Sequence, residues 1–268
     1  MQKFKNLIHR ILKIFNLKIV KNDFFVDLDN SKKNFEHNFN RYEFIFNNSR
    51  IKDQEKLFSL VNDSKSQLFQ DLFVLNELDY LKDGFFIEIG AANGIDLSNT
   101  YLLEKKFNWN GVVVEPAQIW KKDLTKNRSC TISYDCIYSE TGLKVEFLET
   151  TKPEFSTLKI DNKSKDIHET YRLKNNKTYQ LNTLSFSDFS TKYKLPKKID
   201  YLSVDTEGTE LDILKSIELN NFDIKLITVE HNFTEKREAI YSYLNNHGYE
   251  RVLEKFSLVD DWYVKNYE

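Results

Sequence analysis

The stretch FFIEIGAANG, residues 85–94, determines how the rest of the chain is interpreted. It begins with apolar residues typical of a buried strand and passes into a turn of small residues between Gly90 and Gly94. Glycine adopts backbone conformations that other residues avoid, and it lets the main chain come close to a ligand. A helical pattern begins near Leu97. The stretch therefore predicts a strand, a tight turn and a helix.

Downstream of this stretch, short apolar segments alternate with helical patterns, which predicts an α/β fold with a mostly parallel sheet and helices on both faces. We expect strands at residues 85–89, 111–115, 131–136, 199–204, 224–230, 248–254 and 258–264, and helices at residues 98–107, 118–125, 211–217 and 235–246. No helical pattern separates the last two strands, which predicts an antiparallel hairpin at the sheet edge. The polar, basic residues 159–177 are expected to form an inserted loop near the active face.

The part of the chain before this alternation has a different character. We expect an N-terminal extension over residues 1–65 and the main domain over residues 66–268. Residues 66–81 have a strong helical pattern, which carries the polar pair Gln70 and Asp71.

Residues 1–21 form a basic amphipathic pattern, with apolar side chains on one helical face and lysine and arginine around the other. Such a helix either lies on an anionic membrane surface or packs on the domain or on a partner subunit, and the pattern fits both. A membrane contact would place the protein at the inner membrane surface.

Charge and composition exclude several classes of protein. The 268 residues include 39 Lys and Arg against 41 Asp and Glu, a formal net charge of −2, which argues against nonspecific nucleic-acid binding. Cys130 and Cys136 are the only cysteines, too few for a disulfide framework or a four-cysteine zinc site. The chain has no apolar segment long enough to span a membrane and no signal-peptide core at its start. We expect a cytoplasmic globular protein, with an oligomer left open.

Two carboxylates at predicted strand ends indicate a bound nucleoside. In open α/β sheets, ligands bind beyond the carboxyl ends of the strands, where Glu88 and Glu115 lie. Glu115, at the end of the second strand, suits two ribose hydroxyls. Gly90 and Gly94 are spaced G-x-x-x-G and lack the middle glycine of a dinucleotide site. Glu88 suits the cationic groups of S-adenosylmethionine, so this cofactor is favoured over NAD, and a turn without any ligand is the third reading.

Four blocks in order carry a resemblance to a known family: SQLFQDLFVL (66–75), FFIEIGAANGIDLSNTYLLE (85–104), WNGVVVEP (109–116) and IDYLSVDTEGTELDIL (199–214). Together they closely resemble the FkbM-type methyltransferases over roughly residues 66 to 252. The resemblance implies a Rossmann-like class I methyltransferase fold with seven strands, and methyl transfer to oxygen. Substrates in this family are often sugars of polysaccharides or natural products. This chain departs from the family at Ala92, often acidic or polar there, and in the insertion at 159–177.

The resemblance also implies which residues bind the cofactor, in three groups. Its methionine part is held by Glu88 and by the turn residues Gly90, Ala91, Asn93 and Gly94. Glu115 holds the ribose and Pro116 begins the adenine wall, while Asp135 and Cys136 end the third strand at the adenine edge. Polar helix residues close the site: Gln70, Asp71 and Asn99.

Methyl transfer to a hydroxyl needs either a general base or a bound divalent cation. The fourth and fifth strands end in Asp205-Thr206-Glu207 and in Glu230-His231, so these side chains are expected to converge in one cleft. Asp205, Glu207 and His231 are the candidate catalytic residues. Asp205, Glu230 and His231 are the candidate ligands for Mg²⁺ or Mn²⁺, a set similar to that of the metal-dependent catechol-type enzymes. The number of carboxylates favours the metal, and the alternative has His231 as the base.

These observations predict an S-adenosylmethionine-dependent O-methyltransferase that acts on a hydroxyl of a sugar or glycan. The alternative from another class is a non-catalytic module that binds a membrane or a partner and retains the fold. The set of buried carboxylates disfavours the alternative, since each costs stability unless its charge is satisfied. An NAD-linked oxidoreductase is the third reading.

Overall fold

The computed structural model describes residues 42–47, 51–159, 169–174 and 176–267. The chain divides into two compact units, Met1–Asn48 and Ser49–Glu268. In the first unit residues 42–47 are helical, and the amphipathic pattern expected over residues 1–21 lies outside the described residues. The second unit carries the predicted site.

The second unit is built on a seven-stranded sheet with the order β3-β2-β1-β8-β9-β11-β10. Neighbouring strands from β3 to β9 are parallel, and β11 runs antiparallel to both β9 and β10. The mostly parallel sheet and its C-terminal hairpin are thus confirmed, although a short helix, α11 (Glu254–Ser257), lies between the two hairpin strands where no helix is expected. The strands are β1 Phe85–Ile89, β2 Asn110–Val114, β3 Thr131–Ser133, β8 Lys198–Val204, β9 Asp223–Glu230, β10 Tyr249–Val252 and β11 Asp260–Lys265.

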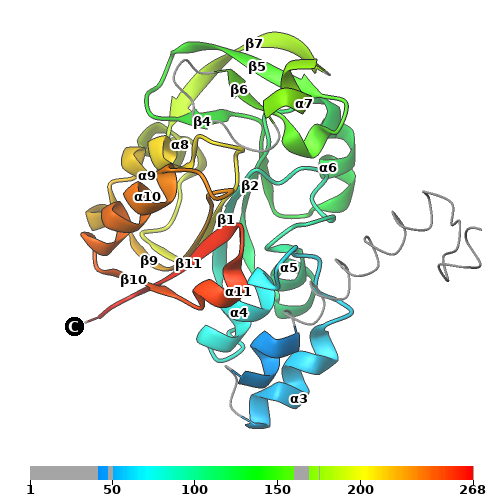
Figure 1. Ribbon diagram of the computed structural model, residues 1–268, viewed down its shortest axis with the longest axis vertical. Helices are drawn as coiled ribbons and strands as arrows, with labels where there is room; N and C mark the ends of the chain where they lie inside the picture. Colours follow the sequence, from blue (N-terminus) through cyan, green and yellow to red (C-terminus); the bar gives the residue numbers. More distant parts are fainter. Residues whose placement is uncertain (1–41, 48–50, 160–168, 175, 268) are drawn as a thin grey trace, which may run out of the picture. The chain divides into compact units, whose positions relative to one another are not determined.

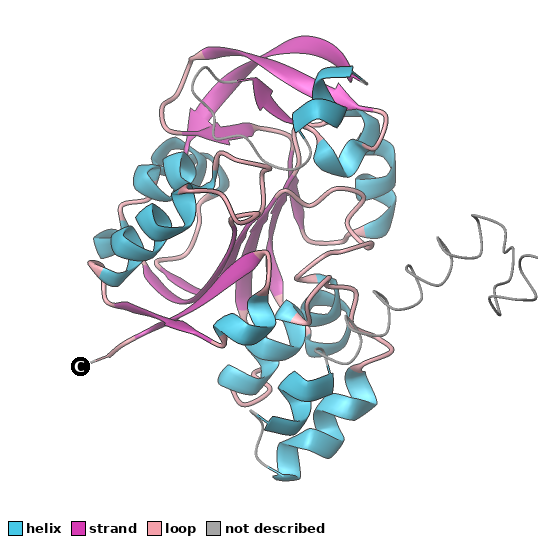
Figure 2. Ribbon diagram, in the orientation of Figure 1, coloured by secondary structure: helices cyan, strands magenta, loops and turns pink. Residues whose placement is uncertain are grey.

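Helices lie on both faces of this sheet, with α8, α9 and α10 on one face and α4, α5 and α6 on the other (Figures 1 and 2). Each helix predicted within the described residues is present, with ends that differ by a few residues. The helices are α3 Ile51–Leu60, α4 Gln70–Glu77, α5 Tyr101–Phe107, α6 Lys121–Asn127, α7 Glu169–Lys174, α8 Phe186–Tyr193, α9 Glu210–Ser216, α10 Lys236–Asn245 and α11 Glu254–Ser257, with short 3₁₀ turns η1 Gln118–Trp120, η2 Pro153–Phe155 and η3 Leu219–Asn221.

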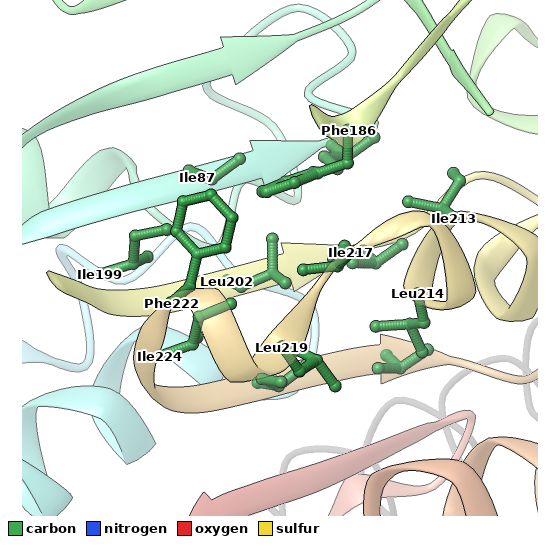
Figure 3. Packing of buried hydrophobic residues seen from close by; sticks show 14 of the residues in the cluster. Ile87, Phe186, Ile199, Leu202, Ile213, Leu214, Ile217, Leu219, Phe222 and Ile224 are labelled. Atoms are coloured by element: carbon green, nitrogen blue, oxygen red, sulfur yellow. The ribbon is translucent and has the colours of Figure 1, made fainter. Parts of the chain in front are cut away.

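The alternation of side chains along β1 explains how the two faces differ. Ile87 and Ile89 point into the main hydrophobic core, where they meet residues of β8, α8 and α9 such as Leu202 and Phe186 (Figure 3). Successive strand residues face opposite sides, so Phe86 and Glu88 point to the face that α5 covers. Because helices cover both faces of a parallel sheet, the side chains on both sides of its strands are buried. Such strands therefore appear in the sequence as continuous apolar segments.

A second, four-stranded sheet is inserted between β3 and β8, and it corrects two predictions. Its order is β4-β7-β5-β6, with β4 Cys136–Tyr138, β5 Lys144–Thr150, β6 Thr157–Lys159 and β7 Asn176–Ser185. The strand predicted over 131–136 ends at Ser133, and Cys136 begins β4 of the inserted sheet. The loop predicted over 159–177 is also wrong, since β6 ends and β7 begins within that range and α7 lies between them. Both β5 and β7 have exposed and buried positions. Because their exposed residues are polar, these two strands do not appear as apolar segments in the sequence.

No helix among the described residues combines the length and the apolar character that crossing a membrane requires.

Candidate active site

A cavity of about 320 Å³ lies at the carboxyl ends of β1, β2, β8 and β9. The inserted sheet closes it from the other side through residues of β5, η2 and β6, so the cavity has a wall that the parallel sheet does not supply. Its lining includes Gly90, Ala91, Ala92, Leu97, Glu115, Pro116, Trp120, Cys136, Phe147, Phe155, Ser156, Thr157, Leu158, Asp205, Thr206, Glu207, Glu230 and Asn232.

The turn after β1 forms one end of this cavity, and it depends on Gly90. Gly90 has φ +93°, and a Cβ there would lie 1.6 Å from the carbonyl oxygen of Asp205. The amides of Gly90 and Ala91 both donate to the carbonyl of Val114, at 2.9 and 3.1 Å. The amide of Asp205 donates to the carbonyl of Ile89 at 2.9 Å. Only glycine fits here, because the turn passes directly against the end of β8.

Glu115, just beyond β2, is buried and lines the cavity. Its carboxylate accepts hydrogen bonds from the amides of Ala92 (2.9 Å) and Ala117 (2.8 Å). Burial raises the pKa of Glu115 to about 7, the two amides lower it, and the charge of Glu149 raises it further. A carboxylate offers about four acceptor positions, so acceptor capacity remains for a ligand in the cavity.

Glu88 is predicted to hold the cofactor, but the structure places it outside the cavity lining. Its carboxylate accepts from Ser98 Oγ (3.0 Å), Thr100 Oγ1 (2.6 Å) and the amide of Asn99 (2.7 Å). The guanidinium of Arg128 completes the set at 3.1 Å, and both charged side chains are almost wholly buried. Glu88 therefore fastens the segment before α5 and neutralises Arg128.

Gly94 and Asn93 also act within this local structure and do not line the cavity. A Cβ at Gly94 would lie 2.7 Å from Arg128 Cγ, so the glycine makes room for the arginine stem. Asn93 Oδ1 accepts from the amides of Ile95 and Asp96, each at 2.9 Å, which is an Asx turn. Both residues shape the loop that leads from β1 to α5.

The three polar helix residues predicted to close the site are buried elsewhere. Asp71 accepts from the hydroxyls of Ser64 and Ser66, each at 2.7 Å, and Gln70 Nε2 donates to Asp260 at 2.7 Å. Asn99 Nδ2 donates to Ser203 at 3.0 Å, and its Oδ1 is buried without a hydrogen bond from the described residues.

The two residues predicted at the adenine edge separate. Asp135 is held by Lys192 at 2.6 Å and by the hydroxyl of Tyr193 at 2.8 Å, and it does not line the cavity. Cys136 does line it, as the first residue of β4 rather than as the end of β3.

An acidic cluster occupies the part of the cavity beyond β8 and β9. Carboxylate oxygens of Asp205, Glu207 and Glu230 lie within 4.8 Å of one another. Burial and the charge of Asp260 raise the pKa of Asp205, which shares a hydrogen bond with Glu230. Burial and the charge of Asp205 raise the pKa of Glu230 well above its ordinary value. This pair therefore retains a proton under conditions in which ordinary carboxyls are ionised.

His231 is predicted to be a base or a metal ligand in this cluster, but the structure places it outside the cluster. Its side chain is buried and absent from the cavity lining. Nδ1 accepts from the amide of Phe233 at 3.0 Å, and Nε2 lies 3.6 Å from Asp261 Oδ1 on β11. The ring of His231 is therefore directed toward β11 and away from the cavity. The acidic cluster thus comprises Asp205, Glu207 and Glu230 without His231.

A sequence model of the methyltransferase FkbM domain matches residues 88–251, more than half of the chain. The chain belongs to the FkbM methyltransferase family. No curated protein sequence matches it.

Two solved methyltransferases are similar to this FkbM-family chain in backbone. An FkbM methyltransferase from Methylobacillus flagellatus superposes with a TM-score of 0.47 at 11% identity, covering 85% of this chain and 58% of that one. A precorrin-6y C5,15-methyltransferase from Geobacter metallireducens gives 0.38 at 12% identity, covering 73% and 87%. The chain therefore spans little more than half the length of the Methylobacillus protein.

In this FkbM domain, the cavity residues that sequence reasoning missed belong mostly to the inserted sheet. Phe147, Thr157 and Leu158 wall the cavity, and Arg172 on α7 pairs with Glu207 at 2.5 Å. Arg128, the partner of Glu88, was also missed. The available signal was a short alternation of polar and apolar residues at the start of β5, which is too brief to distinguish a strand from a polar loop.

Proposed function

We propose that the protein transfers a methyl group from S-adenosylmethionine to a hydroxyl of a sugar or glycan. The observation that carries the proposal is one cavity with two chemically distinct ends. Glu115 and the Gly90 turn lie at one end, and the carboxylates of Asp205, Glu207 and Glu230 lie at the other. An adenosine-bearing donor and a hydroxyl acceptor need these two ends in that arrangement.

The residues at the first end fit the donor. Glu115 has acceptor capacity toward the cavity, and two ribose hydroxyls donating to it would favour its ionised form. Pro116, Trp120 and Phe147 supply apolar surface for a flat base. S-adenosylmethionine supplies a methyl group on a sulfonium, which an acceptor oxygen displaces in line.

The residues at the second end suit activation of the acceptor. Burial raises the pKa of both Asp205 and Glu230, so an ionised carboxylate of this pair is a stronger base than usual and can accept the hydroxyl proton as the oxygen attacks. Several carboxylates also repel anions and accept hydrogen bonds from a polyhydroxyl compound, which favours a neutral sugar over an acidic one. A divalent cation bound by Asp205, Glu207 and Glu230 is the alternative means of activation, and His231 has no part in it.

A binding measurement and a turnover assay test the proposal. Calorimetry with S-adenosylmethionine should show binding to the wild-type protein, whereas no binding would support the non-catalytic module. With a glycoside acceptor, Asp205→Asn should lower turnover by about a hundredfold and leave cofactor affinity nearly unchanged, because the loss falls on the proton transfer. Unchanged turnover in this variant would remove Asp205 from the mechanism.

A chelator separates the two means of activation. If the carboxylate pair acts as the base, wild-type turnover persists in the chelator, and if a cation is required, turnover is lost and returns with Mg²⁺ or Mn²⁺. His231→Asn serves as the control, and it should retain most of the turnover under both conditions because His231 lies outside the cavity.

A further inference from the structure

The turn that carries Asp205 is held in a strained conformation. Glu207 has φ +60° and Gly208 has φ +113°, so two successive residues lie in the left-handed region. A glutamate adopts this region rarely, because its Cβ approaches the neighbouring carbonyl. Such a conformation persists only where surrounding contacts enforce it. The contacts around residues 205–208 therefore decide where the Asp205 carboxylate lies.

Part of this support comes from the helix that follows the turn. One oxygen of Glu210, the first residue of α9, accepts from the amides of Thr206 (3.0 Å) and Gly208 (2.7 Å) and from the Thr206 hydroxyl (3.0 Å). These bonds fix the interior of the turn, and they belong to the parallel-sheet framework itself.

The rest of the support comes from the inserted sheet. Thr157 Oγ1 on β6 donates to the carbonyls of Thr206 (3.2 Å) and Glu207 (3.0 Å), and Thr157 is buried. Arg172 on α7, also buried, pairs with the Glu207 carboxylate at 2.5 Å, and its Nε donates to the carbonyl of Phe155 at 2.8 Å. One element of the insertion thus holds the backbone of the strained residue, and another holds its side chain.

We propose that Thr157 and Arg172 are positioning residues, through which the inserted sheet holds the strained Asp205 turn in place for methyl transfer. The inference rests on the proposed function for the role of Asp205. In this inference, the ion pair between Arg172 and the Glu207 carboxylate attaches the turn to the inserted sheet. Because β6 also walls the cavity, the surface that meets the acceptor and the contacts that place Asp205 belong to one piece of structure. Changes in the insertion then alter acceptor fit and reactivity together.

Hydrogen exchange tests the Thr157 contact without cofactor or acceptor, so its result stands even if methyl transfer is not the function. In Thr157→Val, the amides of Thr206 and Gly208 should exchange about 5- to 10-fold faster than in the wild type, since a buried hydrogen bond to the turn is lost. Thr157→Ser retains the hydroxyl and should restore most of the protection.

Thr183→Val is the matched control. Thr183 is equally buried in β7, and its hydroxyl donates to the carbonyl of Glu140 at 2.6 Å, far along the chain from the turn. It should lower the melting temperature about as much as Thr157→Val and leave exchange over residues 203–212 unchanged. Equal exchange in the two valine variants would overturn the assignment of Thr157.

A double-mutant cycle tests the Arg172 contact by the same exchange measurement. Arg172→Met and Glu207→Gln should each speed exchange over residues 203–212, and the double variant should be no faster than the more affected single one, because the two side chains act as a pair. If Arg172→Met does not fold, Arg172→Lys supplies the cycle, with a smaller increase. Additive effects, or exchange confined to α7, would overturn the assignment of Arg172.

Discussion

Glu88 and Glu115 belong to neighbouring parallel strands, yet their surroundings differ completely. Glu88 is paired in β1–β2 with Val113 and lies inside its strand, where four donors including Arg128 occupy its carboxylate. Glu115 lies one residue beyond β2, and among the described residues its donors are two backbone amides. The carboxylate of Glu88 is therefore occupied by contacts that stabilise the fold, whereas that of Glu115 faces the cavity.

The comparison shows what makes a buried carboxylate available to a ligand. Within a strand, a side chain is directed to one face or the other, and Glu88 meets the α5 side. Beyond the strand end, the chain is free of that alternation, and the side chain can point along the sheet axis into the cleft. Glu115, Asp205 and Asn232 lie just beyond the ends of their strands and line the cavity, whereas His231, also just beyond a strand, is directed toward β11.

The sharpest way to test this contrast is the same substitution at both positions. Glu88→Gln should lower the free energy of unfolding by about 3 kcal/mol, the lower end for a broken buried ion pair, because Glu104 still pairs with Arg128 at 2.5 Å. Glu115→Gln should change it by less than about 1 kcal/mol near pH 7, since burial raises the pKa of this carboxyl to about 7 and its charge adds little to stability there. Urea denaturation measures both, and equal losses would contradict the division of roles.

The fold was predictable because its strands are buried on both faces. FFIEI and the segment around Val112 are continuous apolar segments, and a glycine turn after the first strand is a strong signal of strand–turn–helix order. The inserted sheet has one open face, so its strands mix Lys, Thr and Gln with apolar residues, as in β7. Hydropathy alone could not separate them from a polar loop.

The site was predictable by strand but not by side-chain direction. The sequence placed Asp205, Glu207, Glu230 and His231 at two strand ends, and the first three do converge. His231 fails because its ring turns toward Asp261 of β11, a strand of opposite direction that the sequence could not place in register. Arg172 could not be found at all, because a single arginine in a polar segment has no pattern that indicates burial.

The next test compares the two carboxylates by their effect on cofactor affinity instead of stability. Glu115→Ala should weaken S-adenosylmethionine binding by roughly 1–3 kcal/mol, because the ribose hydroxyls lose a charged acceptor. Glu88→Gln, at a temperature where it remains folded, should leave the affinity almost unchanged because Glu88 does not line the cavity. Calorimetry gives both values. A larger loss of affinity at Glu88 than at Glu115 would reverse the comparison and restore Glu88 as a cofactor residue.

The dependence of the two readouts on pH provides the last test, because stability and cofactor affinity should change in opposite directions. Burial raises the pKa of Glu115 to about 7 in the folded protein, above its ordinary value of 4.5. The folded state therefore binds this proton more tightly than the unfolded state, so the contribution of Glu115 to stability falls as pH rises from about 4.5 to about 7. Cofactor binding needs the ionised carboxylate, so affinity should instead rise, by about tenfold from pH 6 to pH 8. Both trends should flatten in Glu115→Gln, whose difference from the wild type removes the contributions of other titrating groups. If the affinity of the wild type changes with pH no more than that of the variant, the ribose contact is not made by this carboxylate.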